Sequence, residues 1–335
     1  PVRSDPPAGA SMTDGTPAPP PLPDSVKGRI AAGAFLLVDK PRGPSSHQVT
    51  AWVRDLLDVE RAGHAGTLDP NVSGLLWVGL GPALKLIPLV LEFPKRYVGA
   101  VVFHAPVAAR ELERVVGEFT APIYQTPPVR SAVRRERRIR TIHRMTIVER
   151  EKDRAILDLV ADSGTYVRTL AVDLGEALGV GAHLAELRRV GTGPFTEAES
   201  VPLPRIADAV ERARTGDSGP LESLLHPARE VWQEFPQIVL KDAAGSAVVH
   251  GAGLAAGGIA SMSAPFAANA AVALVSRSGE LLAVGHALVD SREIAGHRKG
   301  WVVRADRVLA DAGQHPPSWH GAPATAGSPR PPDGR

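Results

Sequence analysis

The stretch RAGHAGTLDPNVSGLL, residues 61–76, places a single carboxylate, Asp69, on an Asp-Pro turn between glycines and an apolar run. Most Asp-Pro dipeptides simply begin a turn. An ionised carboxylate can also act as a nucleophile or as a base that removes a proton. Because the chain contains no cysteine, disulfides, thiolate zinc sites and cysteine nucleophiles are excluded, and a nucleophile must be a carboxylate, a hydroxyl or an amine.

Three further stretches hold aromatic, cationic and apolar side chains that could work with Asp69. They are KRYVG (95–99) with Tyr97, SGTYVRTLAVDLG (163–175) with Tyr166 and Arg168, and GAHLAELRRV (181–190) with Leu187. Taken singly, each has an ordinary interpretation as a core tyrosine, a surface ion pair or a packing leucine. A functional interpretation therefore requires that the fold brings them together.

Positive charge is concentrated in VRSAVRRERRIRTIHR (129–144), which carries seven arginines and one glutamate, although the formal charge of the whole chain is only +2. An isolated run of this kind is usually a solvated surface. Beside a candidate catalytic site it favours binding to the phosphates of a nucleic acid. The candidate nucleic-acid contacts in this run are Arg134, Arg135, Arg137 and Arg138.

A length of 335 residues predicts about two domains. Residues 1–28 and 313–335 are rich in proline, glycine and alanine, and we expect both segments to be mostly disordered. Helices and strands interleave over residues 29–234 without a regular βαβ repeat, which predicts an α+β domain with a mixed sheet. Short strands and glycine turns over residues 235–312 predict a small β-barrel-like domain. No run is long and apolar enough to span a membrane.

Strands are expected where short apolar or β-branched runs occur, and helices where apolar residues recur every three or four positions. The expected strands are 34–40, 97–104, 155–161, 237–241, 246–253, 271–276, 281–289 and 300–309. The expected helices are 45–59, 109–119, 167–179 and 182–190. Trp52 is expected on the buried face of the first helix, and VPLPRIADAV (201–210) is expected to be a connector.

The segment GAGLAA (251–256) has the glycine spacing of a dinucleotide-binding loop. That interpretation also needs a long helix after the glycines and an acidic residue about 20 positions further on. The following AAGGIASMSAPF contains helix breakers instead. A dinucleotide site is therefore rejected.

Together and in this order, the stretches around Asp69 resemble the pseudouridine synthases of the family that includes the bacterial T-loop tRNA enzyme and dyskerin. The resemblance extends from LLVDKPRGPSSHQV (36–49) to about residue 310, and its most specific part is GHAGTLDPNVSGLL (63–76). Ala65 departs from the small hydroxyl residue that the family more often has, but it flanks the aspartate and does not replace it. The resemblance implies isomerisation of a uridine flipped out of RNA, with no metal or other cofactor.

The same resemblance implies roles for single residues. Asp69 would be the catalytic carboxylate, and Arg168 the cation that favours its ionised form. Tyr97 would stack on the flipped uracil, with assistance in removal of the C5 proton as a second role. The residues implied to bind the substrate uridine are His64, Tyr166, Leu187 and Lys40.

FTAPIYQTPPVRSAVRRERRIRTIHR (119–144) resembles the archaeal and eukaryotic branch of the family, in which a box H/ACA guide RNA pairs with the substrate and small protein subunits assist. Residues 235–312 resemble a PUA domain, where Gly251 and Gly253 would let RNA approach the backbone closely. This implies a guided, cytoplasmic, archaeal-type enzyme that acts on rRNA. The alternatives are a stand-alone tRNA T-loop pseudouridine synthase and a non-catalytic RNA-binding scaffold, which loss of Asp69, Tyr97 or Arg168 would have favoured.

Overall fold

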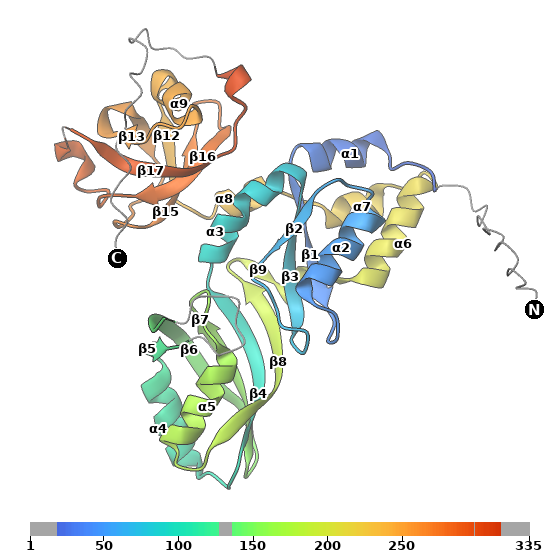
Figure 1. The fold of residues 1–335 in the computed structure, drawn as a ribbon, viewed down its shortest axis with the longest axis vertical. Helices are drawn as coiled ribbons and strands as arrows, with labels where there is room; N and C mark the ends of the chain where they lie inside the picture. The colour runs from blue at the N-terminus through green and yellow to red at the C-terminus, as the bar shows by residue number, and fades with distance from the viewer. Residues whose placement is uncertain (1–18, 127–135, 298, 316–335) are drawn as a thin grey trace, which may run out of the picture.

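Two separate β-sheets divide the chain into a larger N-terminal part and a smaller C-terminal part (Figure 1). The structure is a computed structural model that describes residues 19–126, 136–297 and 299–315. Within these residues the larger sheet has eleven strands, in the order β10-β1-β3-β8-β4-β7-β6-β5, with β11, β2 and β9 paired at its sides. Most neighbours are antiparallel, but β1–β10 and β3–β8 are parallel, which confirms the predicted mixed sheet and α+β class.

One half of the large sheet packs between two helical layers. Its elements are β1 (Ala34–Lys40), β2 (Ala62–Ala65), β3 (Ser73–Leu80), β10 (Val201–Pro202), β11 (His226–Pro227), α1 (Asp24–Ala31), α2 (Ser46–Leu56), η1 (Gly81–Leu86), α3 (Ile87–Glu92), α6 (Leu203–Arg214) and α7 (Gly219–Leu224). Because side chains alternate along a strand, Leu36 and Val38 pack toward α2 and α6, while Phe35 and Leu37 pack toward α3. Both faces of β1 are therefore buried.

The other half of the large sheet carries two helices on one face (Figure 1). Its elements are β4 (Lys95–Phe103), α4 (Ala109–Phe119), β5 (Pro122–Gln125), β6 (Arg138–Arg150), β7 (Arg154–Ala161), α5 (Val167–Ala177), β8 (Ala182–Thr192), β9 (Phe195–Thr196) and η2 (Glu197–Glu199). The apolar faces of α4 and α5 pack on β4, β6 and β7. Strand β8 lies between β3 and β4 and so joins the two halves of the sheet.

The C-terminal part is a six-stranded sheet in the order β13-β17-β16-β15-β12-β14, with helix α9 packed on its own apolar core. Its elements are β12 (Gln237–Leu240), α9 (Asp242–Val249), β13 (Leu254–Ala255), η3 (Ala256–Gly258), β14 (Ile259–Met262), β15 (Ala271–Val275), β16 (Leu281–Ala287), η4 (Ile294–Gly296), β17 (Trp301–Val308) and η5 (Ala312–Gln314). Helix α8 (Arg229–Trp232) precedes it. The predicted small β domain is confirmed.

The two parts share an apolar cluster. Phe93 at the end of α3 stacks on Phe235 in the connecting segment, with ring centroids 4.9 Å apart. Ala271 and Val284 of the C-terminal sheet are buried in the same cluster as Phe35 of β1. Lys85 adds a polar contact, since its Nζ donates to the carbonyl of Leu309 at 2.9 Å.

Residues 182–190 were predicted to be helical, and this prediction is wrong, because they form strand β8. Its ladder with β4 runs over nine residues of β4. The backbone N–H and C=O groups of residues 182–190 therefore pair with a neighbouring strand and not with one another, as they would in a helix. The strand predicted at residues 246–253 is also wrong, because 242–249 form helix α9. Gly251 follows this helix with φ +92°, and the N–H of Ala252 bonds back to the carbonyl of Ala247, which is the usual glycine stop of a helix.

Three smaller predictions also need correction. Residues 1–28 were expected to be disordered, but α1 begins at Asp24, and Leu22 and Val26 are buried, because both side chains join the core under β1. The expected connector at 201–210 is strand β10 followed by helix α6, whose apolar face covers the same core. Trp52 is 46% exposed and not on the buried face of α2. In the part of the chain that the structure describes, no helix is long and apolar enough to cross a membrane.

Candidate active site

The loop between β2 and β3 holds Asp69 on a backbone that is fixed at both sides. On one side, the buried Ser46 hydroxyl accepts from the N–H of Leu68 at 2.8 Å and donates to its carbonyl at 2.9 Å. On the other side, the N–H of Gly43 donates to the carbonyl of Pro70 at 2.8 Å. The backbone on both sides of Asp69 is thus held by hydrogen bonds to other segments, which an ordinary Asp-Pro turn does not need.

Lys40 supports the same loop from a buried position. Its side chain is 0% exposed, and its Nζ donates to the carbonyls of Pro41 and Pro44 at 2.8 Å and of Pro70 at 3.4 Å. Burial lowers the pKa of Lys40 from its usual value, and the nearby Asp69 acts in the opposite direction. Backbone carbonyls enclose its ammonium, which gives Lys40 a structural role in this loop, and substrate binding by Lys40 stays a prediction.

Asp69 and Arg168, which are 99 residues apart, meet in an ion pair. Arg168 Nη2 lies 2.6 Å from Asp69 Oδ2, and both side chains are 58% exposed. Exposed ion pairs contribute about 0–1 kcal/mol to folding, so this one is of little use to stability. It leaves a carboxylate open to a substrate, with a guanidinium beside it.

The start of α5 fixes the position of Arg168. Tyr166 is the residue before this helix, and its main chain is held by the buried Gln125, whose Oε1 accepts from the Tyr166 N–H at 2.9 Å and whose Nε2 donates to the Tyr166 carbonyl at 3.1 Å. Arg168 follows in the first turn of α5. Gln125 and Ser46 could not be predicted from the sequence, because a single polar residue gives no sign that it will be buried against a distant backbone.

Tyr97 and Leu187 lie on one face of the sheet. In the β4–β8 ladder Tyr97 pairs with Arg189 and Gly99 pairs with Leu187, so residues 97, 187 and 189 point the same way. Tyr97 and Leu187 are partly buried and pack against the cluster that includes Val167 of α5. Tyr97 and Leu187 therefore lie beside the helix that supplies Arg168.

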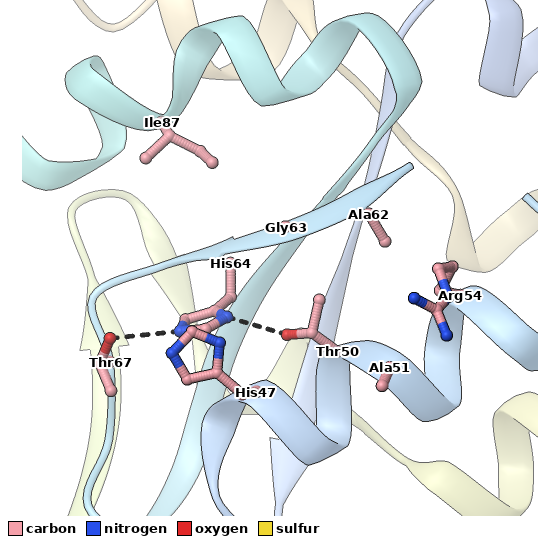
Figure 2. A pocket seen from close by; sticks show the side chains of 9 residues that line it. All are labelled: His47, Thr50, Ala51, Arg54, Ala62, Gly63, His64, Thr67 and Ile87. Atoms are coloured by element: carbon pink, nitrogen blue, oxygen red, sulfur yellow. Dashed lines mark hydrogen bonds between the residues drawn. The ribbon is translucent and has the colours of Figure 1, made fainter. Parts of the chain in front are cut away.

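His64 lines a cavity of about 520 Å³ next to the Asp69 loop (Figure 2). Thr50 Oγ1 lies 3.0 Å from its Nδ1 and Thr67 Oγ1 lies 3.2 Å from its Nε2, so both ring nitrogens have partners. Burial, followed by the charges of His47 and Arg189, lowers the pKa of His64 to about 4. A neutral, fixed imidazole at this position can offer a rigid wall to a flipped nucleotide.

The arginine-rich segment is described only in part, since Arg134 and Arg135 lie outside the described residues. Arg137 is exposed, and its guanidinium lies 4.2 Å from the centre of the exposed Tyr124 ring. Arg138 begins strand β6. An arginine over an exposed aromatic ring is a surface on which a nucleic acid can both stack and pair charge.

The two glycines predicted to contact RNA have structural reasons to be glycine. Gly251 ends α9 in the left-handed conformation, and an added Cβ there would meet nothing within 4 Å. At Gly253 an added Cβ would lie 2.7 Å from the ring of Trp301. The close approach at Gly253 is thus to a tryptophan of the same chain, and RNA contact at both glycines stays a prediction. The rejection of a dinucleotide loop agrees with a helix that precedes these glycines and does not follow them.

Comparison with known families accounts for most of the chain. Four family models match in order: the TruB family pseudouridylate synthase N-terminal domain at 54–111, the Pus10 C-terminal model at 91–177, the tRNA pseudouridylate synthase B C-terminal domain at 168–232, and the PUA domain at 236–309. The chain is 45% identical over 287 residues to a protein of Pyrobaculum arsenaticum named probable tRNA pseudouridine synthase B, covering 85% of this chain and 87% of the relative. A protein of the same name in Methanothermobacter thermautotrophicus is 41% identical over 301 residues, which cover 90% and 93% of the two chains.

Solved structures match over the same extent. A chain of a Cbf5-Nop10-Gar1 complex superposes with a TM-score of 0.79 at 35% identity, covering 90% of this chain and 92% of that one. A chain of an H/ACA ribonucleoprotein bound to a substrate RNA containing 2′-deoxyuridine superposes with a TM-score of 0.75 at 32% identity, covering 92% and 95%.

Fold and site define an RNA-modifying enzyme with a mixed-sheet catalytic domain and an RNA-binding PUA domain. The chain belongs to the TruB family of pseudouridine synthases. The reaction breaks the bond between N1 of uracil and C1′ of ribose and joins C5 to C1′, and the proton lost from C5 is balanced by a proton gained at N1. A carboxylate can act as a nucleophile or as a base in this reaction, and Asp69, paired with Arg168, is exposed to solvent.

Proposed function

We propose that this chain is the catalytic subunit of a box H/ACA ribonucleoprotein and converts uridine to pseudouridine in rRNA at sites chosen by a guide RNA. Its partners would be the guide RNA, the substrate RNA and small protein subunits such as those in the matching complexes. Within it, we propose Asp69 as the catalytic carboxylate, Arg168 as its ionic partner, Tyr97 as the stacking ring, and His64, Tyr166 and Leu187 as walls of the uridine site.

The observation that carries this proposal is the Asp69–Arg168 pair at 2.6 Å in a chain that includes a PUA domain and matches a chain of the Cbf5-Nop10-Gar1 complex over 90% of its length. Localisation in the cytoplasm is part of the proposal, because the relatives are archaeal. A stand-alone tRNA enzyme is the second candidate, and the names of the relatives favour it.

The test compares rRNA and tRNA fragments, each incubated with the full chain and small subunits, with and without a guide RNA. We expect pseudouridine, detected as a mass shift after chemical labelling, only in the rRNA fragment and only when the guide is present. Turnover of the tRNA fragment without a guide would support the second candidate.

Asp69→Asn, which is close to isosteric, should lower turnover to background and leave RNA binding within about twofold. Residual turnover near the wild-type rate would contradict the catalytic assignment of Asp69.

A further inference from the structure

Arg189 is a buried cation at the centre of the large sheet. It is 2% exposed, and its backbone pairs with Gly74 of β3 on one side and with Tyr97 of β4 on the other. Its Nε donates to the carbonyl of Leu75 at 2.8 Å, while its Nη2 is buried with no hydrogen-bond partner in the described part of the chain. Burying a charged group with an unmet donor destabilises a fold. Stability therefore does not explain an arginine at this position.

The guanidinium lies directly beneath the loop that carries Asp69. Gly66, three residues before Asp69, has φ +69°, and an added Cβ there would lie 2.9 Å from Arg189 Nη1. The head group thus lies against the underside of this bend, and a side chain at residue 66 would require the guanidinium to shift. On its own strand pair, Arg189 shares a face with Tyr97. Arg189 therefore lies next to the Gly66 bend, which leads to Asp69, and next to Tyr97 on the neighbouring strand.

The electrostatic influence of Arg189 agrees with this placement. Its charge contributes to the lowered pKa of His64 and, after burial, to that of Lys95, which is lowered to about 7. Burial lowers the pKa of Arg189 itself, and the neighbouring Tyr97 acts in the opposite direction. His64 of β2 and Lys95 of β4 are thus both influenced by this one guanidinium.

We propose that Arg189 is a positioning residue of the uridine isomerisation, which holds Tyr97 and the Gly66 bend of the Asp69 loop at a fixed separation. The stacked uracil and the attacking carboxylate must meet in one geometry, and an error of ~1 Å between reacting groups can cost about a hundredfold in rate. A rigid, planar head group in a dry position keeps that separation better than a flexible apolar chain. The proposal rests on the activity of the family and not on the choice of RNA substrate.

The first experiment compares Arg189→Met with Arg188→Met in an RNA that the wild-type chain converts. Arg188 is the adjacent residue on the opposite face of β8, where it pairs with Asp39 at 2.9 Å and with Glu197 at 2.7 Å. We expect Arg189→Met to lower kcat about a hundredfold with KM and melting temperature little changed, and Arg189→Lys to recover part of the loss. Arg188→Met should retain the wild-type kcat. If Arg189→Met also raises KM and lowers the melting temperature substantially, the residue has a general structural role and the proposal is overturned.

The second experiment is a double-mutant cycle with Gly66→Ala. The strain of an alanine at φ +69° is the same in both backgrounds, whereas the contact with Nη1 exists only when Arg189 is present. Gly66→Ala should therefore lower kcat more in the wild-type background than in Arg189→Met. Independent, additive effects would contradict a supporting contact. If Arg189→Met does not fold, Arg189→Lys serves in the same cycle.

A third measurement separates this proposal from the proposed function, because it needs no RNA. The imidazole of His64 is titrated by NMR in the free, full chain and in the Arg189→Met and Arg188→Met variants. We expect the pKa of His64, about 4 in the wild type, to rise only in Arg189→Met. An unchanged titration would show that the charge does not lie beneath the site, whatever RNA the enzyme modifies.

Discussion

At the scale of single residues, the site fixes the backbone of Asp69 and leaves its carboxylate open. Ser46 and Gly43 hold the peptide groups on either side, whereas the side chain is 58% exposed and meets Arg168. Fixed placement with free access is what a group that must contact a substrate requires. Tyr166 likewise has its main chain held by another residue, since its N–H donates to the side chain of Gln125.

Replacement of Tyr97 tests whether its ring or its hydroxyl matters more. Stacking of an aromatic ring on a base is worth roughly 1–3 kcal/mol. We therefore expect Tyr97→Phe to retain more activity than Tyr97→Ala, with the difference about tenfold or more in kcat/KM. Mass-shift labelling of pseudouridine in single turnovers measures both variants. Complete loss in both would indicate that the hydroxyl takes part in proton transfer.

His64 predicts an acid-dependent loss of stability. Its pKa falls from 6.5 to about 4 on folding, so between these values the unfolded chain binds a proton that the folded chain does not. The free energy of unfolding should therefore decrease as the pH falls from about 6.5 to about 4. Melting temperatures of the wild type and His64→Gln at pH 7 and pH 4.5 measure this. The wild type should lose more between the two, and parallel losses would show that His64 is not the group responsible.

At the scale of elements, the arginine-rich segment that leads into β6 is expected to bind RNA phosphates. Neutralising Arg134, Arg135, Arg137 and Arg138 to glutamine should weaken RNA affinity and reduce the slope of log K against log salt by about one unit for each lost phosphate contact. Filter binding over a range of salt concentrations measures the slope. A matched control is glutamine at exposed arginines of α6, such as Arg212. An unchanged slope would assign the segment to a protein partner or to solvent.

How much could be predicted differs between elements. The helix at α2, the strands β1 and β4 and the start of α5 follow from local apolar spacing and turn residues, which is why Tyr97 and Arg168 could be placed on their elements from sequence. The strands β2 and β3 on either side of the Asp69 loop were not predicted. Strand β8 could not be predicted, because AHLAELRRV (182–190) is rich in alanine, leucine, glutamate and arginine, which favour a helix. Only its two neighbours in the sheet, β3 and β4, make it a strand.

The surroundings of single residues were unpredictable for the same reason. Nothing in the sequence indicates that three carbonyls supplied by two loops enclose the ammonium of Lys40. Arg189 has no local pattern that distinguishes it from Arg188, and only the strand register shows that one is buried and the other paired at the surface. Burial produced by residues distant in sequence is not readable from a single chain.

At the scale of the whole molecule, the shared apolar cluster fixes the PUA domain relative to the active site. Phe235 stacks on Phe93 at this boundary, so Phe235→Ala should loosen it. If an anchored guide RNA positions the target, guided turnover should fall about tenfold or more, since misplacement by ~1 Å is costly. Turnover of RNA without a guide, if the wild type shows any, should fall less. Equal retention of guided turnover would contradict anchoring through the PUA domain, and circular dichroism checks that the variant is folded.

The same cluster has a consequence for biosynthesis. A chain leaves the ribosome from its N-terminus, and domains generally fold in that order. The apolar side chains of β1 and α3 that contact Phe235, Ala271 and Val284 are made well before those partners. Until the last third of the protein is synthesised, this face of the catalytic domain stays uncovered. A truncated translation product would therefore carry Asp69 and Arg168 but also an exposed apolar surface. Chaperones and proteases recognise such surfaces, so the product would be removed before it can act on RNA without a guide.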